Sequence, residues 1–460
     1  MLEQTTIQQF SQTLVKPLIL PSDSEFDEAR SVWNGMIDKK PAMIAMCTNV
    51  NDITNCINFA RRHNVLVSIK GGGHSVAGRA VCDDGLMINL SQMKSVVVNP
   101  NARTVRVESG AKIGDLDKET QKFGLATPVG IVSQTGIAGL TLGGGIGYLG
   151  RKYGLTLDNL ISAKLITADG KLINASAHEN SDLFWALRGG GGNFGVVSSF
   201  EFKTYKVGPD VMVAQVFYPI EDAKEVLQFY REFTAKAPDE LAGYALVVNV
   251  PPVDPFPKEL QGKTAIAIVA CHSGVLEDGK IALSSLEDFG NPFLKVIMPM
   301  PFVALQTNFD PGVPNGMRYY WKSHYMDTLS DEAIDVFVNH TNRLPGPLSI
   351  VGFEPLGGAI SRVNEQDTAF PQRRASYVLG IWSGWIQPSN DHYVISWTRE
   401  LHDKMKPYTS EGVYSNYLDQ DDEDLIRSSF GKNYNRLQEV KKKYDPNNFF
   451  KLNQNIIPNS

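Results

Sequence analysis

Three glycine-dense segments constrain the fold of this 460-residue chain more than any other feature. The first, residues 70–78, contains His74 within a glycine loop, and the others are residues 135–147 and 182–197. Glycines let backbone N–H groups approach a bound anion closely and adopt positive φ, so such loops are typical of phosphate-binding sites. Taken alone, the first segment fits equally well a tight turn whose histidine caps a strand. Three segments together predict a long ligand lying against the backbone, with a pyrophosphate beside His74.

A competing motif lies at residues 145–150, which fit the pattern G-x-G-x-x-G, with Asp169 at a suitable distance beyond for a ribose contact. That dinucleotide-binding fingerprint requires an apolar strand immediately upstream. The preceding residues 136–142 are interrupted by glycines and do not resemble a central strand. The Rossmann interpretation is therefore the weaker alternative.

Composition fits a large globular enzyme, with 42% hydrophobic and 20% charged residues. The formal net charge of −6 gives no electrostatic footprint for nucleic acid. We interpret the short basic run 441–443 as the solvated face of a C-terminal helix. Residues 1–10 lack the features of a secretory signal, and no apolar stretch is long enough to span a bilayer. We therefore expect a cytoplasmic protein without a membrane or nucleic-acid partner.

The cysteines are scattered without metal-ligand spacing, so we expect neither a metal site nor a disulfide framework. They are Cys47, Cys56, Cys82 and Cys271.

Periodicity predicts a mixed α and β fold. A helix over 50–63 and apolar runs at 65–69 and 86–90 suggest a βαβ unit, and residues 162–175 read as a hairpin turning at Asp169-Gly170. From residue 211 the glycine density falls and a second sheet-plus-helix domain is expected. Its predicted strands are 211–218, 242–250 and 263–272, with a helix over 222–235.

The three glycine segments, in this order, resemble the FAD-linked oxidases of the berberine-bridge-enzyme type, within the vanillyl-alcohol oxidase superfamily. The resemblance covers nearly the whole chain, including its start at 27–35 and its closing motifs at 414–419 and 433–456. It implies an α+β fold: a two-subdomain PCMH-type FAD-binding domain, and a substrate domain with a large antiparallel sheet covered by helices. The implied division is residues 1–206 for FAD binding, 207–410 for substrate binding, and 411–460 returning to the FAD domain.

The resemblance implies FAD as the cofactor, attached covalently through His74 to the flavin 8α-methyl carbon. Many relatives add a cysteinyl link at the position of Val132, and valine cannot form one, so we expect a single covalent bond. No metal is expected. The implied cofactor-binding residues are Gly71, Gly72, Gly73, His74, Ser75, Gly78, Val132, Thr135, Gly136, Gly139, Gly143, Gly147, Gly195, Val197 and Asn453.

The implied activity is that of an oxidase: hydride transfer from an alcohol or amine carbon of a small molecule to flavin N5, with O2 reoxidising the flavin to give H2O2. Tyr417 matches the family's catalytic base, although a core aromatic is the alternative reading. If this segment is a strand, only one of Tyr414 and Tyr417 faces the flavin. Thr135 matches a position that governs oxygen access. A flavin dehydrogenase using another acceptor and a non-catalytic FAD-binding relative stay as alternatives.

The substrate itself cannot be read from the sequence, and alcohol versus amine stays open. We expect residues 376–385 to form a wall of the substrate pocket. Arg373 or Arg374 either meets an anionic substrate or faces water. The protein is expected to be a monomer or a homodimer whose partners are its small-molecule substrate and O2.

Overall fold

The computed structural model describes residues 2–459. Its N-terminal region is built on a three-stranded parallel sheet in the order β1-β3-β2. Helix α3 (Val50–His63) connects β1 (Met43–Met46) to β2 (Val67–Lys70), and β3 (Leu86–Asn89) lies between the two strands. The Asn49 side chain accepts hydrogen bonds from two backbone N–H groups of the first turn, which is why α3 begins there. The predicted βαβ unit and helix are confirmed.

A second sheet of five antiparallel strands has the order β4-β5-β9-β7-β8. Its strands are β4 (Val96–Asn99), β5 (Thr104–Glu108), β7 (Leu160–Ile166), β8 (Leu172–Ser176) and β9 (Val196–Lys203). The hairpin expected over 162–175 is confirmed as β7 and β8. Helix α4 (Ile113–Gln121) buries Ile113 and Leu116 in one core with Val105 and Phe200 of the sheet.

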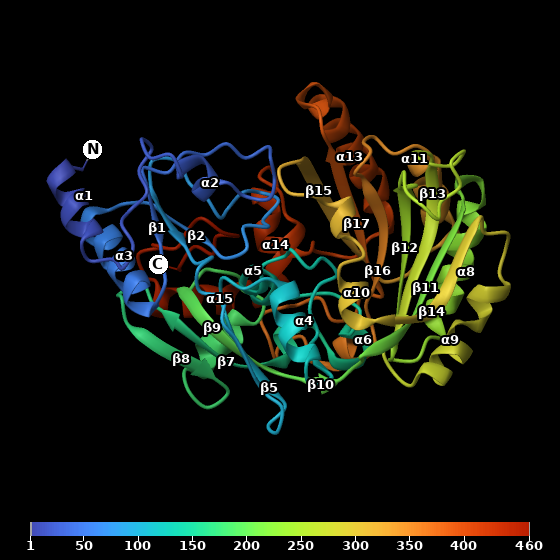
Figure 1. Cartoon of the computed structure of the whole chain (residues 1–460), viewed down its shortest axis with the longest axis horizontal. Helices are drawn as coiled ribbons and strands as arrows, with labels where there is room; N and C mark the ends of the chain where they lie inside the picture. Colours follow the sequence, from blue (N-terminus) through green and yellow to red (C-terminus); the bar gives the residue numbers. More distant parts are fainter. Residues whose placement is uncertain (1, 460) are drawn as a thin grey trace.

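The other half of the molecule is a seven-stranded antiparallel sheet in the order β14-β11-β13-β12-β16-β17-β15 (Figure 1). The strands are β11 (Asp210–Pro219), β12 (Leu241–Asn249), β13 (Thr264–His272), β14 (Leu294–Pro301), β15 (Arg318–Met326), β16 (Ile350–Pro355) and β17 (Tyr377–Trp385). The large antiparallel sheet that the resemblance implied is therefore present.

Helices cover one face of this sheet (Figure 1). They are α8 (Ala223–Ala235), α9 (Leu276–Asp288), α11 (Asp331–Thr341) and α13 (Asp391–Met405). Strand alternation divides the side chains between the two faces. On β11, Val216 packs into the core beneath the helices, whereas Val213 packs with Tyr148 on the opposite face. The face of the sheet that carries no helices therefore packs against the glycine-rich half of the molecule.

The remaining elements are short. They are α1 (Gln4–Ser11), α2 (Phe26–Arg30), α5 (Ile137–Gly143), α6 (Gly150–Tyr153), α7 (Ser181–Leu187), α10 (Phe302–Gln306), α12 (Ala359–Arg362), α14 (Ile426–Phe430), α15 (Tyr434–Tyr444), β6 (Leu125–Ala126) and β10 (Tyr205–Lys206). Because helix α5, not a strand, precedes residues 145–150, the structure excludes the Rossmann alternative at this motif. Within residues 2–459 no helix is both long and apolar enough to cross a bilayer.

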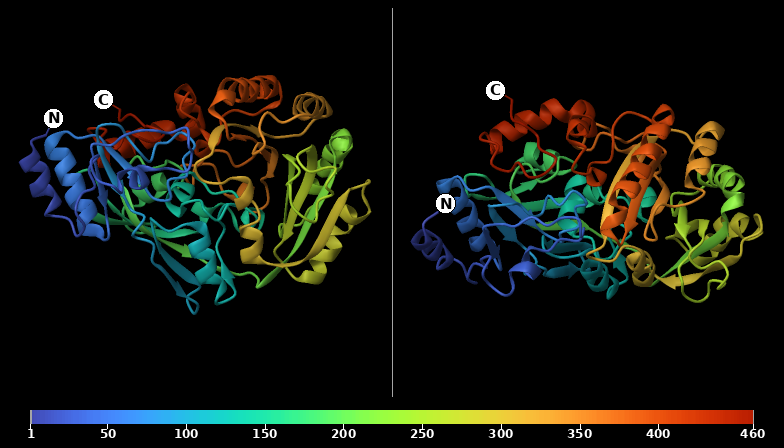
Figure 2. Two further views of the ribbon diagram at one scale, coloured as in Figure 1. Left: turned by 45° about the horizontal axis from the view of Figure 1, so that its top comes forward. Right: turned by 90° about the horizontal axis from the view of Figure 1, so that it is seen from above.

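The C-terminal segment runs back over the N-terminal half (Figure 2). There α15 packs against α7, and both contribute to the core of the five-stranded sheet. Lys441 on α15 is fully buried: its ammonium pairs with Asp445 at 2.7 Å and donates to the carbonyls of Asn193 and Phe450. The expectation of a solvated face is therefore wrong for Lys441, because three oxygen partners compensate the burial of its charge.

Candidate functional site

The three glycine segments meet at one cavity of about 300 Å³ between the two halves. Residues of the predicted cofactor set that line it are Gly71, Gly72, Gly73, His74, Ser75, Val132, Thr135, Gly136, Gly139, Gly195, Val197 and Asn453. Tyr417 lines the same cavity from the C-terminal segment. The structure therefore brings together side chains that are more than 340 positions apart in the sequence.

Three predicted cofactor residues do not line the cavity, and each has a packing reason to be glycine. A Cβ at Gly78 would lie 2.6 Å from the Ile37 side chain. One at Gly143 would lie 2.1 Å from Asn416 Oδ1, and one at Gly147 would lie 1.8 Å from the Val129 carbonyl oxygen. These glycines permit close chain packing around the cavity instead of facing it.

His74 is held by aromatic stacking at the cavity wall. Its ring stacks on Trp33, with centroids 4.2 Å apart, and Trp33 in turn stacks on Tyr319 of β15 at 3.7 Å. The Nε2 atom of His74 is buried without a hydrogen-bond partner among the described residues. Burial lowers the pKa of His74 to about 4, so the imidazole is neutral at neutral pH.

Residues 33–35 fasten the glycine loop to the large sheet. The Asn34 side-chain amide donates to the carbonyls of Val76 at 2.7 Å and Tyr319 at 2.9 Å. The backbone N–H of Gly35 donates to the Met317 carbonyl at 2.7 Å. The loop that carries His74 is thus bonded to the edge strand of the opposite half.

The glycine loop fits an extended dinucleotide. Gly73 has a φ of +69°, a conformation that L side chains rarely adopt. Gly72 approaches Gly136 so closely that a Cβ would lie 2.4 Å from its Cα, so the first two glycine segments abut through backbone alone. The unpartnered imidazole nitrogen and the glycine backbone at the cavity wall fit a phosphate-bearing cofactor.

The cavity is also lined by a hydrogen-bonded acid and phenol, Glu354 and Tyr417. The Tyr417 hydroxyl donates to Glu354 Oε2 at 3.0 Å. Burial raises the pKa of Glu354 to about 8. Burial and the neighbouring Glu354 charge raise the pKa of Tyr417 well above its usual range. Because its raised pKa keeps the phenol protonated at neutral pH, the carboxyl group is the better proton acceptor of the two.

Tyr414 and Tyr417 both line the cavity, contrary to the expectation from strand alternation. Residues Ser415–Tyr417 form a 3-10 turn, so the two rings project into one region and pack edge to face with centroids 4.8 Å apart. The Tyr414 hydroxyl accepts a hydrogen bond from the Gly145 backbone N–H at 2.8 Å. Tyr414 therefore joins the C-terminal segment to the second glycine segment.

The wall of the substrate-domain side comes from β15 and β16, through Trp321 and Glu354, and not from residues 376–385 as predicted. Trp382 of β17 is the cross-strand partner of Trp321 and packs against the Tyr417 ring with centroids 5.6 Å apart. Sequence reasoning missed Glu354, although one acid within the otherwise apolar strand β16 was an available signal.

Neither predicted arginine reaches the cavity. Arg373 is 1% exposed and forms two hydrogen bonds to the Asp158 carboxylate, at 2.8 and 2.9 Å. Arg374 pairs with Glu365 on the surface. Arg373 therefore stabilises the packing between the two halves, and neither arginine is placed to contact a ligand in this cavity.

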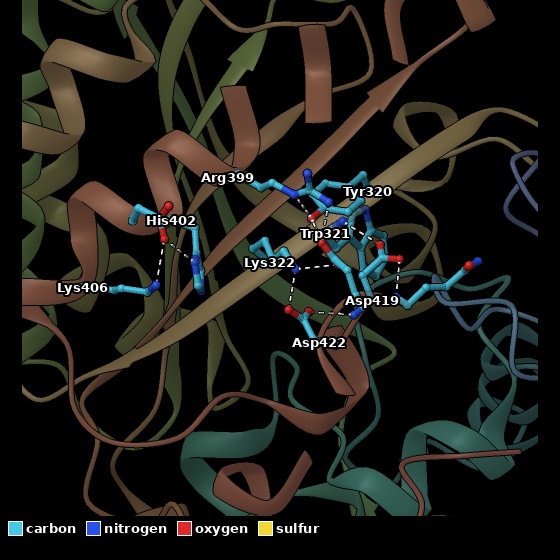
Figure 3. Close-up of polar contacts among 11 residues, drawn as sticks. Tyr320, Trp321, Lys322, Arg399, His402, Lys406, Asp419 and Asp422 are labelled. Atoms are coloured by element: carbon cyan, nitrogen blue, oxygen red, sulfur yellow. Dashed lines mark hydrogen bonds and ion pairs between the residues drawn. The ribbon is translucent and has the colours of Figure 1, made fainter. Parts of the chain in front are cut away.

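A polar network lies behind the cavity wall (Figure 3). The Lys322 ammonium is ion-paired with the carboxylates of Asp421 and Asp422. The backbone N–H of the neighbouring Trp321 donates to Asp419 Oδ2 at 3.2 Å. Two successive residues of β15 thereby hold the C-terminal segment that carries the phenol. Among residues 2–459 no group of three or more His, Cys, Asp or Glu side chains is arranged to hold a metal ion.

Comparisons with known proteins agree with this geometry. The family described as "FAD binding domain" matches residues 41–176, and "Berberine and berberine like" matches residues 413–457. An FAD-linked oxidoreductase of Dictyostelium discoideum is 35% identical over 93% of this chain and 91% of its own length. The chain belongs to the berberine-bridge-enzyme-like FAD-linked oxidoreductases.

Solved structures of this family share the fold over their full length. The 6-hydroxy-D-nicotine oxidase of Arthrobacter nicotinovorans superposes with a TM-score of 0.86 at 26% identity, covering 97% of this chain and 98% of that one. A chitooligosaccharide oxidase superposes with a TM-score of 0.86 at 25% identity, covering 99% and 100%. This berberine-bridge-enzyme-like protein is thus an FAD-dependent oxidoreductase, and the fold predicted from its sequence is confirmed.

Proposed function

We propose that this protein is an oxidase that carries FAD covalently on His74 and oxidises an alcohol or amine carbon of a small molecule, with O2 as the electron acceptor. The observation that carries the proposal is that one cavity is lined both by His74, a neutral imidazole whose Nε2 has no partner among the described residues, and by the hydrogen-bonded pair Glu354–Tyr417. FAD, when bound, accepts hydride from a substrate C–H bond and passes the electrons to O2, giving H2O2.

His74 supplies the attachment point. Nucleophilic attachment needs a neutral imidazole with an available nitrogen, and burial keeps this ring neutral. The stack of Trp33 on His74 fixes the plane of the imidazole ring. A buried Nε2 atom without a hydrogen-bond partner destabilises the protein, so a bond from this atom to the cofactor would remove that cost. Val132 lines the cavity where relatives carry a second, cysteinyl link, and its isopropyl group supplies no nucleophile.

Glu354 and Tyr417 take up the proton that the substrate releases. Oxidation of an alcohol or amine releases a proton from the substrate O–H or N–H as hydride leaves the adjoining carbon. With Tyr417 placed at the cavity wall, its oxygen can accept that proton while its own passes to Glu354 Oε2. A carboxyl group whose pKa is near 8 is matched to this task at neutral pH.

O2 as acceptor is supported by the named activities of two structural relatives, which are oxidases. In this chain Thr135 lines the cavity, and its small side chain leaves room for O2. Cytoplasmic location and a monomeric or homodimeric state belong to the same proposal, on the sequence features given above.

The test begins with the purified protein and its visible spectrum. The chain is denatured in acid, and the precipitate is assayed for flavin. We expect flavin to stay with the wild-type and the His178→Ala control precipitates and to be released from His74→Ala. Release from the wild type would overturn the covalent attachment. A wild-type protein that binds no flavin at all would overturn the whole proposal.

The acceptor is tested separately by substrate screening with paired readouts of H2O2 and dye reduction. Rapid substrate-dependent H2O2 formation supports an oxidase. Dye reduction without H2O2 formation would replace the oxidase by a dehydrogenase.

A further inference from the structure

One charged side chain in the cavity has no counter-ion. Arg79 follows the first glycine loop directly and lines the cavity with it. Its Nη1 donates to the Asn453 carbonyl oxygen at 2.7 Å. Its Nε and Nη2 are both buried and have no hydrogen-bond partner among the described residues. Burial lowers the pKa of Arg79, yet a guanidinium stays protonated at any ordinary pH, so a positive charge is buried there.

The geometry of the free atoms identifies the kind of partner. Nε and Nη2 share one edge of the planar guanidinium, and their N–H bonds point the same way, as a two-pronged donor. Phosphate and carboxylate oxygens are the groups that such an edge binds in bidentate fashion. No described carboxylate forms an ion pair with Arg79, although Asp419, Asp422 and Glu423 lie near enough to influence its charge. The missing anion must therefore come from a ligand.

The adjoining backbone offers further donors to the same anion. The N–H groups of Gly72, Gly73 and Ser75 donate no hydrogen bond to any of residues 2–459. All three residues line the cavity together with Arg79. Asn453, whose carbonyl oxygen holds the Arg79 Nη1 atom, is tied in turn to the third glycine segment by a 3.0 Å bond to the Gly192 carbonyl. The Arg79 guanidinium and the free backbone N–H groups thus line one cavity, and Asn453 of the C-terminal segment holds the guanidinium in place.

We propose that Arg79 binds the diphosphate of the cofactor through its Nε and Nη2 edge and supplies the positive charge of that subsite. The inference rests on the FAD site of the proposed function and deepens it. The flavin end is then held by His74, whereas the phosphate charge is neutralised by a residue five positions further along the same loop. Arg79 is the one lysine or arginine among the described residues that line this cavity.

The experiment uses a background in which the cofactor can dissociate. His74→Ala is prepared without flavin, and its affinity for FAD and for riboflavin, which has no phosphate, is measured by fluorescence quenching. Arg79→Gln is then added. We expect FAD affinity to fall about 10- to 100-fold, the usual value of one charge-assisted interaction, while riboflavin affinity is unchanged. The dependence of FAD affinity on salt should also become weaker.

Controls separate this role from a structural one. Arg151→Gln removes another buried guanidinium that donates to backbone carbonyls, those of Leu356 and Ala237, outside the cavity. It should leave both affinities unchanged. Should Arg79→Gln fail to fold in a thermal melt, Arg79→Lys replaces it, because the lysine keeps the charge and loses the two-pronged edge; a selective loss of FAD affinity is again expected.

An equal loss of FAD and riboflavin affinity, or no loss of either, would overturn the assignment of Arg79 while leaving the flavin site intact. Failure of the His74→Ala parent to bind either compound would instead contradict the proposed function itself.

Discussion

Tyr417 and Glu354 are joined by a 3.0 Å hydrogen bond in which the phenol is the donor. The two residues come from different parts of the chain, the 3-10 turn Ser415–Tyr417 and the strand β16. In the proposed mechanism the direction of this bond gives each residue a role: the phenol accepts the substrate proton, and the carboxyl group receives the phenol's own proton. Five predictions concern this pair and the side chains that support the cavity.

Replacing Tyr417 by Phe should lower kcat by about 100-fold or more, because the proton path to Glu354 is broken. The ring still fills its place against Trp321 and Trp382, so the melting temperature should change little. Steady-state kinetics and a thermal melt measure both effects. Tyr230→Phe is the matched control, since it removes a buried hydroxyl that bonds the Gly243 carbonyl away from the cavity. An unchanged kcat in Tyr417→Phe would remove the phenol from the mechanism.

The pH profile of kcat/KM should report Glu354. As the proton acceptor it must be ionised, so activity should rise with pH by about tenfold per unit up to its pKa of about 8 and then level off. The Tyr417 bond favours the ionised form and lowers the pKa of Glu354. In Tyr417→Phe the ascending limb should therefore move to higher pH. If the ascending limb of the pH profile is the same in Glu354→Gln as in the wild type, a group other than Glu354 titrates.

The same carboxyl group makes stability depend on pH. The pKa of Glu354 is raised from an ordinary value of 4.5 to about 8 in the folded protein, so the folded state holds the proton more tightly. Stability from this group is full below pH 4.5 and is lost as the pH rises towards 8. Relative to the wild type, Glu354→Gln should gain stability across this interval. Melting temperatures between pH 5 and 8 give the test, and a constant difference would contradict it.

Lys322→Met should destabilise the fold by about 3–5 kcal/mol, because it leaves two carboxylates without their shared cation. The ammonium is ion-paired with Asp421 and Asp422 behind the cavity (Figure 3). Adding Asp422→Asn should recover part of the loss, which a double-mutant cycle of melting experiments would measure. Additive effects of the two substitutions would show that the network does not act as a unit.

Trp33→Ala should reduce covalent flavin attachment as well as stability. It removes the ring that stacks on His74 and leaves a cavity costing about 3–5 kcal/mol. Trp397 is a buried tryptophan on α13 that packs against His340. The Trp397→Ala variant should lose a similar amount of stability but keep its flavin. Acid precipitation of both variants at low temperature makes the comparison. Full flavin retention in Trp33→Ala would mean that the His74 imidazole is correctly oriented without the Trp33 ring stacked on it.

Local patterns predicted much of the fold. The helix over 50–63 and the βαβ unit follow from residue spacing and an asparagine cap, which act within one turn of chain. The glycine segments were likewise predicted from the sequence to line a ligand site, because glycine is required wherever backbone must approach backbone or ligand. Gly78, Gly143 and Gly147 were also predicted to bind the cofactor but do not line the cavity, and close packing places the same demand on a residue as ligand contact does.

The second half of the site was less predictable because it depends on which strands become neighbours. Strand alternation within residues 376–385 could not show that Trp321 of β15 and Glu354 of β16 line the cavity, with β17 paired between these two strands in the same sheet. Lys441 was misread because its partners, Asn193 and Phe450, are defined only once distant segments meet. Pairing order and tertiary partners are set by the whole chain, not by local sequence.

Residues 33–35, which bond Val76 on one side and β15 on the other, fix the separation of the two cavity walls. Neither wall has to travel for the reacting groups to meet. A substrate therefore enters a site that is already assembled, and little of its binding free energy is consumed in bringing the halves together. Selection between substrates then falls to shape and polarity at the wall, not to a closing motion.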